Sequence, residues 1–173
     1  EEVFVKKAID DLAILMMLKF NKKKPIVFNT VQMYRWDRLE YLKILLNDKN
    51  NNDIIFGFKL VRGAYMEKER LTAKSLNIKS PICESKLETD VNFDSGLDFV
   101  FENLNRISLV CGSHNEESVI KIMNIMKEMN IDNNDQKIWF GQLYGMSDNI
   151  TYNLADKGYN AFKILPFGPV RNL

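Results

Sequence analysis

The sequence predicts an α/β fold in which helices cover a parallel sheet, and the form we expect is an incomplete (βα)8 barrel. Short apolar runs alternate with helical patterns along the whole chain, which is typical of parallel α/β folds. Within each run nearly every residue is apolar, as in strands that are buried on both faces. No G-x-G-x-x-G fingerprint follows any run, which weakens the competing open dinucleotide-binding sheet.

Five apolar runs are predicted as strands. They cover residues 26–32, 54–61, 107–112, 137–141 and 161–165. Five strands are too few for a complete barrel, which usually needs about 250 residues. We therefore expect residues 1–173 to form one barrel domain that is truncated at both ends.

Helical patterns separate these runs, at residues 3–19, 36–46, 66–76 and 87–104 and after Asn115. In the first, Ala8, Leu12, Leu15 and Leu18 follow one another at helical spacing and predict a buried apolar face. Asn115 is a suitable N-cap for the last helix. Its apolar stripe consists of Val119, Ile122, Met123 and Met126, and the series Met123, Met126 and Met129 is expected to be core packing.

Composition excludes several classes of function. Lys and Arg number 24 against 23 Asp and Glu, so no basic surface for nucleic acid is expected. Cys83 and Cys111 have no further ligand at metal-binding spacing, which predicts reduced thiols and no metal site. The longest apolar run is too short to span a bilayer, and no signal or transit segment is visible.

Each predicted strand ends in residues that can bind a ligand. They are Gln32, residues 59–65, residues 113–115, Gln142 with Leu143, and residues 166–168. In parallel α/β folds such strand ends converge on one rim and form the active site. Structural explanations remain open, because Lys59 could extend its charge to solvent and His114 could be a turn residue. No Ser-His-Asp order, Cys-His pair or carboxylate pair is present, which favours an organic cofactor that carries the reaction.

The residues at these strand ends resemble one known family. "FKLVRGAYMEKER" resembles the fifth-strand motif of proline dehydrogenases, and "IVFNTVQMY", "SHNEESV", "FGQLYGM" and "KILPFGPV" follow in the family's order. The resemblance covers essentially the whole chain and is greatest to the monofunctional, eukaryote-like branch. It implies a (βα)8 barrel with noncovalent FAD that oxidises L-proline to 1-pyrroline-5-carboxylate, the first step of proline catabolism.

The resemblance also implies partners and a compartment. Electrons would pass from the flavin to a membrane quinone, with peripheral membrane association and no nucleic acid. The protein would be mitochondrial, on the inner membrane, in a eukaryote, and cytoplasmic and membrane-associated in a bacterium.

The resemblance further assigns roles to individual residues. Lys59 would lie beside flavin N5 and O4, where its charge stabilises the reduced flavin, and Tyr65 would join it as a catalytic residue. The expected cofactor contacts are Gln32, Lys59, Val61, Arg62, Gly63, Ser113 and His114, with Arg62 near the phosphates. The expected substrate pocket is Leu60, Ala64, Tyr65, Leu143 and Ile164. Hydride would pass from proline C5 to flavin N5.

Departures from the family pattern leave alternatives. Ile164 stands where many members have Tyr, which would loosen substrate preference toward hydroxyproline or another cyclic imino acid. Met66 replaces a Trp that in some members stacks on adenine. The family's Arg pair for the substrate carboxylate lies beyond the last residue, so these 173 residues alone are expected to be weakly active or inactive. The other candidates are a non-catalytic flavin-binding barrel and a barrel enzyme that binds a phosphorylated substrate at Arg62.

Overall fold

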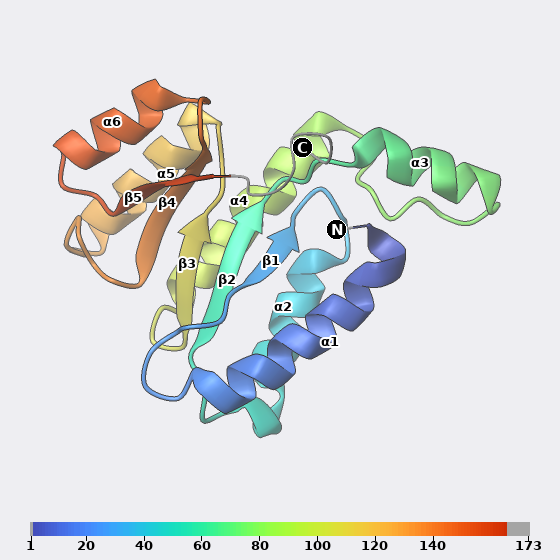
Figure 1. Ribbon diagram of the computed structural model, residues 1–173, viewed down its shortest axis with the longest axis horizontal. Coiled ribbons are helices and arrows are strands. Elements are labelled where there is room, and N and C mark those ends of the chain that lie inside the picture. The colour runs from blue at the N-terminus through green and yellow to red at the C-terminus, as the bar shows by residue number, and fades with distance from the viewer. Residues whose placement is uncertain (1, 166–173) are drawn as a thin grey trace. The chain divides into compact units, whose positions relative to one another are not determined.

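The computed structural model describes residues 2–165, which divide into two compact units with the boundary in the chain between Ser108 and Leu109 (Figure 1). The first unit contains α1 (Val3–Phe20), β1 (Asn29–Gln32), α2 (Arg38–Asn47), a 3₁₀ turn η1 (Lys49–Asn51), β2 (Phe56–Val61), α3 (Met66–Ser75) and α4 (Lys86–Glu102). The second contains most of β3 (Ile107–Cys111), then α5 (Glu116–Glu128), β4 (Ile138–Leu143), α6 (Asp148–Asp156) and β5 (Ala161–Ile164).

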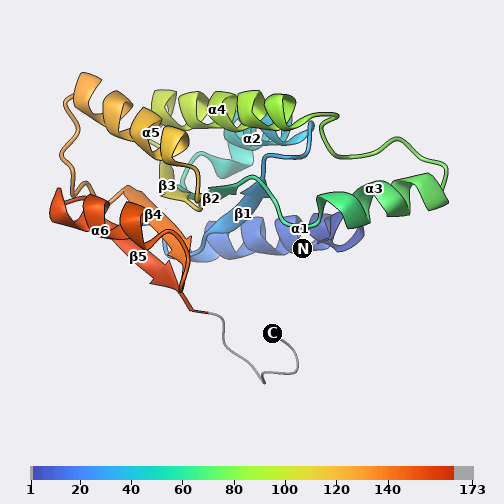
Figure 2. The same ribbon diagram turned by 90° about the horizontal axis from the view of Figure 1, so that it is seen from above.

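In the first unit β1 and β2 are parallel, and α2 and α4 lie on one side of them while α1 runs along β1 (Figure 2). Side chains alternate along β2, so Phe58 and Leu60 share one face and Lys59 occupies the other. Phe58 and Leu60 are fully buried, and Gly96 of α4 lies close to the Leu60 side chain. The helical layer therefore covers the Leu60 face of this strand pair.

In the second unit β3, β4 and β5 form consecutive parallel pairs. In the first unit the Phe56 backbone N–H donates to the carbonyl of Arg106, directly before β3, at 2.8 Å. The strand order is β1-β2-β3-β4-β5. The α/β class with about five strands is thus confirmed, and α6 is a helix that the sequence pattern did not predict.

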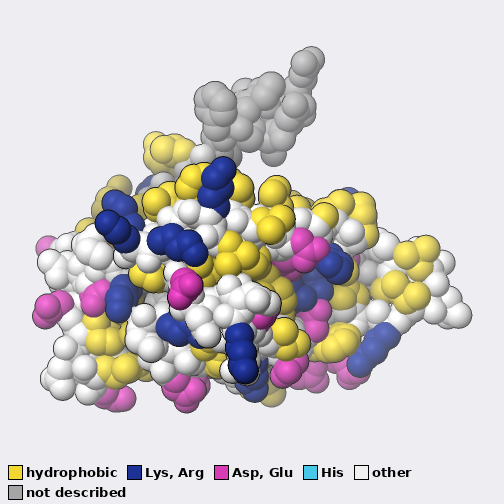
Figure 3. Space-filling view, turned by 90° about the horizontal axis from the view of Figure 1, so that it is seen from below, with side chains coloured by type: hydrophobic (Ala, Val, Ile, Leu, Met, Phe, Trp, Pro, Cys, Tyr) yellow, Lys and Arg dark blue, Asp and Glu magenta, His cyan; other side chains and the backbone are white. Residues whose placement is uncertain are grey.

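The first helix forms where expected but buries the opposite side. Ala8, Leu12 and Leu15 are exposed, with Leu12 59% and Leu15 63% accessible, whereas Lys6 and Asp10 are buried. The prediction that these residues form the buried face of this helix is therefore wrong. The face of the molecule drawn in Figure 3 likewise shows hydrophobic side chains at the surface, between lysine and arginine side chains.

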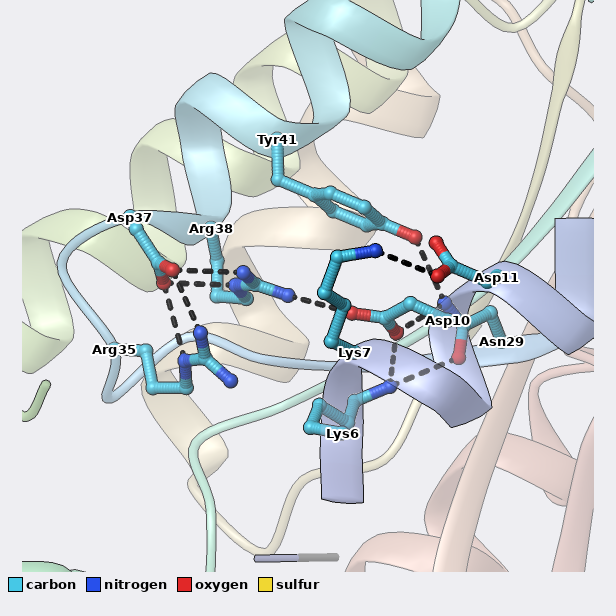
Figure 4. Close-up of polar contacts among 9 residues, drawn as sticks. All are labelled: Lys6, Lys7, Asp10, Asp11, Asn29, Arg35, Asp37, Arg38 and Tyr41. Carbon is cyan, nitrogen blue, oxygen red and sulfur yellow. Dashed lines mark hydrogen bonds and ion pairs between the residues drawn. The ribbon is translucent and has the colours of Figure 1, made fainter. Parts of the chain in front are cut away.

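A buried polar network explains why α1 turns its charged side inward (Figure 4). Asp10 accepts hydrogen bonds from Lys6 on its own helix, from Asn29 Nδ2 at 2.8 Å and from Arg38 Nη1 at 2.9 Å. Lys6 also donates to Asn29 Oδ1 at 3.0 Å. Buried charges are tolerated only when they are paired and hydrogen-bonded, and this network meets that condition.

Asp37 extends this network toward the C-terminal end of β1. Its carboxylate takes two hydrogen bonds from Arg38, at 2.8 and 2.7 Å, and two from Arg35, at 3.1 and 2.6 Å. Burial alone would raise the pKa of Asp37, but the hydrogen bonds from Arg38 and Arg35 outweigh it and lower that pKa.

Several smaller features bear on individual residues of the sequence. Asn115 caps α5, since its Oδ1 accepts from Ser118 N at 2.9 Å. Of the methionine series, Met126 is fully buried but Met129 is 49% exposed, so Met129 is not core. Cys83 and Cys111 are free and buried. Within residues 2–165 no helix could cross a membrane and no cluster of metal-binding side chains occurs.

Candidate functional site

The predicted residues of the first unit gather at the end of the β1–β2 pair. Thr30 lies opposite Lys59 and Gln32 lies opposite Val61, so these four side chains share one face of the sheet. Gln32 is buried, whereas Lys59 and Val61 are partly accessible on the face opposite Leu60. The structure therefore places a cation beside an amide at the carboxyl end of parallel strands.

Leu60 occupies a different position from the other predicted pocket residues. It is 0% exposed and points toward α4, where a Cβ added to Gly96 would lie 3.7 Å from its Cδ1. A ligand on the Lys59 face would thus be separated from the Leu60 side chain by the strand itself. Leu60 fixes the packing beneath the site.

Arg62 follows β2 and is partly exposed. Its Nε donates to Asp90 of α4 at 2.7 Å, and its guanidinium lies 4.4 Å from the centre of the Phe93 ring. Burial would raise the pKa of Asp90, but hydrogen bonds from Lys86 and Arg62 lower it, so the carboxylate stays charged at neutral pH. These contacts hold the Arg62 side chain against α4.

The turn after Arg62 is shaped by Tyr34. Gly63 has φ +130°, and a Cβ at this position would lie 2.6 Å from the Tyr34 ring. Tyr34 N donates to the Arg62 carbonyl at 2.7 Å, which continues the strand pairing into the turn. Beyond it Ala64 is exposed and Tyr65 is 45% exposed, at the start of α3. Only glycine suits this backbone, and the turn presents Ala64 and Tyr65 to solvent or ligand.

In the second unit Ser113 and His114 follow β3. The Ser113 side chain is buried and accepts from Asn115 N at 3.1 Å. Gln142, fully buried on β4, donates to the Ser113 carbonyl at 3.2 Å and accepts from Thr151 of α6 at 2.9 Å. This chain of hydrogen bonds fixes the segment that carries His114.

The His114 ring is linked to the turn before α6. Its Nδ1 shares a hydrogen bond of 2.9 Å with Ser147 Oγ. Lys163 of β5 donates to the Met146 carbonyl and pairs with Asp148, both at 2.6 Å. Partial desolvation of this largely exposed ring, and then the positive charge of Lys163, lower the pKa of His114, so the imidazole is neutral at pH 7.

Leu143 and Ile164 form the apolar part of the site in this unit. They lie opposite each other in the parallel β4–β5 pair, and Leu143 is 44% exposed. Their neighbours Gln142 and Lys163 form the adjacent pair and project from the other face, toward α6. The structure thus brings two predicted substrate contacts side by side. The predicted turn at residues 166–168 lies outside the described residues.

The donor set of these strand ends fits a flavin nucleotide. Lys59 and Arg62 supply positive charge for an anionic ring or phosphates, and Gln32 and His114 supply hydrogen-bonding groups. The Gly63 turn has no side chain and leaves its backbone accessible. Within the first unit, Gln32, Lys59 and Arg62 are the residues that would hold the group. Ser113 and His114 are the corresponding candidates within the second unit.

The sequence pattern did not identify several residues that hold this site. They are Tyr34, Asp90, Ser147, Thr151 and Lys163. Lys163 has the only local signal, since a cation within an apolar strand is unusual. The others are joined to their partners only by the fold.

The chain is similar to known proteins along its whole length. A family model described as proline dehydrogenase matches residues 1–173. Proline dehydrogenase 1, mitochondrial, of Dictyostelium discoideum is 35% identical over 100% of this chain and 31% of its own length. The human protein of the same name is 35% identical over 98% of this chain and 29% of its own length. The chain thus spans about a third of the length of the curated relatives it matches.

Solved structures show the same fold. A crystal structure of proline utilization A from Bdellovibrio bacteriovorus, inactivated by N-propargylglycine, has a TM-score of 0.88 at 26% identity. The match covers 98% of this chain and 18% of the other. The five parallel strands therefore correspond to part of the barrel of that enzyme, and the chain belongs to the proline dehydrogenase family.

Proposed function

We propose that the protein containing this chain is an FAD-dependent proline dehydrogenase that oxidises L-proline to 1-pyrroline-5-carboxylate. The observation that carries the proposal is the position of Lys59, which shares a sheet face with Gln32 at the carboxyl end of β2, in a chain of this family. FAD, when bound, supplies the oxidising chemistry by accepting the hydride from the carbon next to the proline nitrogen.

The residues of the chain would bind and orient the cofactor and the substrate. Lys59 holds a positive charge at the site, which favours the anionic form of a reduced ring. Arg62, which Asp90 holds in place, would balance the negative charge of the phosphates. Ser113 and His114 are the proposed nucleotide contacts of the second unit. The proposed apolar contacts for the proline ring are Ala64 and Tyr65 in the first unit and the adjacent Leu143 and Ile164 in the second.

A second substrate is supported by a specific observation. By the resemblance to the family, Ile164 stands where many members have Tyr, and Leu143, which lies opposite it in the β4–β5 register, is also apolar. Hydroxyproline dehydrogenase of Xenopus laevis is 36% identical over 98% of this chain and 37% of its own length. Hydroxyproline is therefore the second candidate substrate.

The acceptor and compartment follow from the same proposal. Relatives from Dictyostelium discoideum and Homo sapiens carry the word mitochondrial in their names, so we propose the mitochondrion if the source is eukaryotic. We propose a membrane quinone as acceptor and peripheral association with the membrane that contains it. In a bacterium the corresponding place is the cytoplasmic face of the membrane.

The test uses the full-length protein loaded with FAD, with its visible spectrum recorded anaerobically before and after L-proline is added. Bleaching of the flavin band is expected. Lys59→Met should slow the bleaching and make the flavin potential more negative, whereas Lys74→Met, an exposed lysine of α3, should change neither. An unbleached band with L-proline that bleaches with hydroxyproline would select the second substrate. A band that neither compound bleaches would refute both.

A further inference from the structure

We propose that Ser147 positions the imidazole of His114 for contact with the bound flavin nucleotide. This inference rests on the proposed function, since it assigns a task to a residue toward FAD. The two residues are far apart in sequence, at the ends of β3 and at the start of α6, yet Ser147 Oγ and His114 Nδ1 are 2.9 Å apart.

The geometry of the ring supports this assignment. Ser147 engages Nδ1, and no residue in 2–165 hydrogen-bonds Nε2. His114 is exposed, so Nε2 is accessible to a ligand. A partner on one imidazole nitrogen sets both the tautomer and the ring orientation that the other nitrogen presents. Ser147 thus determines what His114 offers at the rim.

The backbone at Ser147 is costly and firmly held. Its φ of 52° and ψ of 45° lie in the left-handed region, which is unfavourable for a residue with a side chain. Lys163 fixes the turn from both sides, through the Met146 carbonyl and the Asp148 carboxylate. Such strain persists where the surroundings over-determine it, and it is concentrated at functional sites.

Helix capping does not explain the serine. Ser147 occupies the N-cap position of α6, but its side chain makes no capping hydrogen bond to that helix. Glycine would suit the left-handed backbone better. The hydroxyl therefore serves His114 and not the helix.

The experiment compares Ser147→Gly with Asn130→Gly in the full-length protein. Asn130 has φ 54°, nearly the same as Ser147, but lies at the end of α5 and makes no contact with His114. Both changes relieve the strain of a left-handed backbone, but only Ser147→Gly removes the hydroxyl that hydrogen-bonds His114. Neither should lower the melting temperature of the apoprotein.

The readouts are the Kd for FAD, measured by titration of the apoprotein, and the ¹⁵N shifts of the His114 ring. Ser147→Gly should raise the FAD Kd about fivefold, the effect of one hydrogen bond, while Asn130→Gly leaves it unchanged. In Ser147→Gly the ¹⁵N shifts of the His114 ring should change from those of a single tautomer to the average of the two tautomers. In a His114→Ala background, Ser147→Gly should have no further effect on the FAD Kd.

Three results would overturn the inference. The first is an unchanged FAD Kd in Ser147→Gly while the wild type binds FAD. The second is an equal loss of affinity in the presence and absence of His114, which would show a general effect on the turn. The third is a wild type that does not bind FAD, which would reject the proposed function as well. In that third case the ¹⁵N shifts still report whether Ser147 fixes the tautomer, so the two failures are distinguishable.

Discussion

Replacing Asp10 with Asn should destabilise the protein strongly, because this carboxylate neutralises two buried cations. Asp10 is 7% exposed at the side chain, Lys6 is 0% and Arg38 is 8%. Asn keeps the size of the side chain and removes the charge. Breaking a buried ion pair by removing one partner costs about 3–5 kcal/mol, since the remaining charge stays buried. We expect a loss within that range.

The matched control lies one residue away on the same helix. Asp11 pairs with Lys7 at 2.7 Å, but the two side chains are 62% and 84% exposed. An exposed pair four residues apart on a helix contributes about 0.3–0.5 kcal/mol. Asp11→Asn removes the same charge from nearly the same place, so a general effect of net charge would appear in both variants.

The assay is urea unfolding of the full-length protein and both variants, followed by circular dichroism. The midpoint should fall clearly for Asp10→Asn and barely for Asp11→Asn. A difference below about 1 kcal/mol between them would refute the view that the network stabilises α1 through buried charge, because that is the range of an exposed pair.

Three further predictions follow from single contacts. Gly57→Ala should cost about 1–3 kcal/mol in urea unfolding, since the new Cβ would lie 2.4 Å from the Val27 carbonyl oxygen; an unchanged midpoint would contradict this packing. Lys163→Met should raise the pKa of His114 in an NMR titration, because the cation that opposes ring protonation is lost; a lower pKa would reject that cause. Tyr34→Phe should change the unfolding free energy by less than about 1 kcal/mol, because the buried hydroxyl makes no hydrogen bond of full geometry and approaches only the Tyr65 backbone; a larger loss would show that this contact stabilises the turn.

How far the sequence predicts the fold is seen at α1. Helical spacing identified the element correctly, with ends close to Val3–Phe20. It could not identify the buried face, because that depends on what lies beside the helix. Arg38 and Asn29 are distant in sequence, and they make burial of Asp10 favourable. Periodicity contains no information about such partners.

The candidate site shows the same division. The residues at the ends of parallel strands are predictable because they occur in short sequence motifs. The structure places Gln32 beside Val61, at the ends of β1 and β2, as expected for such strands. Ser147 could not be found this way, since its role depends on a turn that approaches His114 from another element. Asp90, which holds Arg62 from α4, is hidden for the same reason.

Strand alternation explains why similar motifs contain residues with different tasks. Of two consecutive residues at the end of a strand, one faces the helices and the other faces the opposite side. On β2 the helix-facing residue is Leu60 and Lys59 lies on the other face, whereas on β5 the helix-facing residue is Lys163 and Ile164 lies on the other face.

The charge of a lysine within such a strand therefore does not by itself make that lysine a cofactor contact. Lys59 can reach a ligand because the residue after it faces α4, and Lys163 cannot because its ammonium is held by the Met146 carbonyl and Asp148 beside α6. Shifting either strand by one residue would exchange these tasks, because every side chain would move to the other face. The register of β2 and β5, and not their composition, decides which lysine is accessible to the proposed cofactor and which one supports the turn at Ser147.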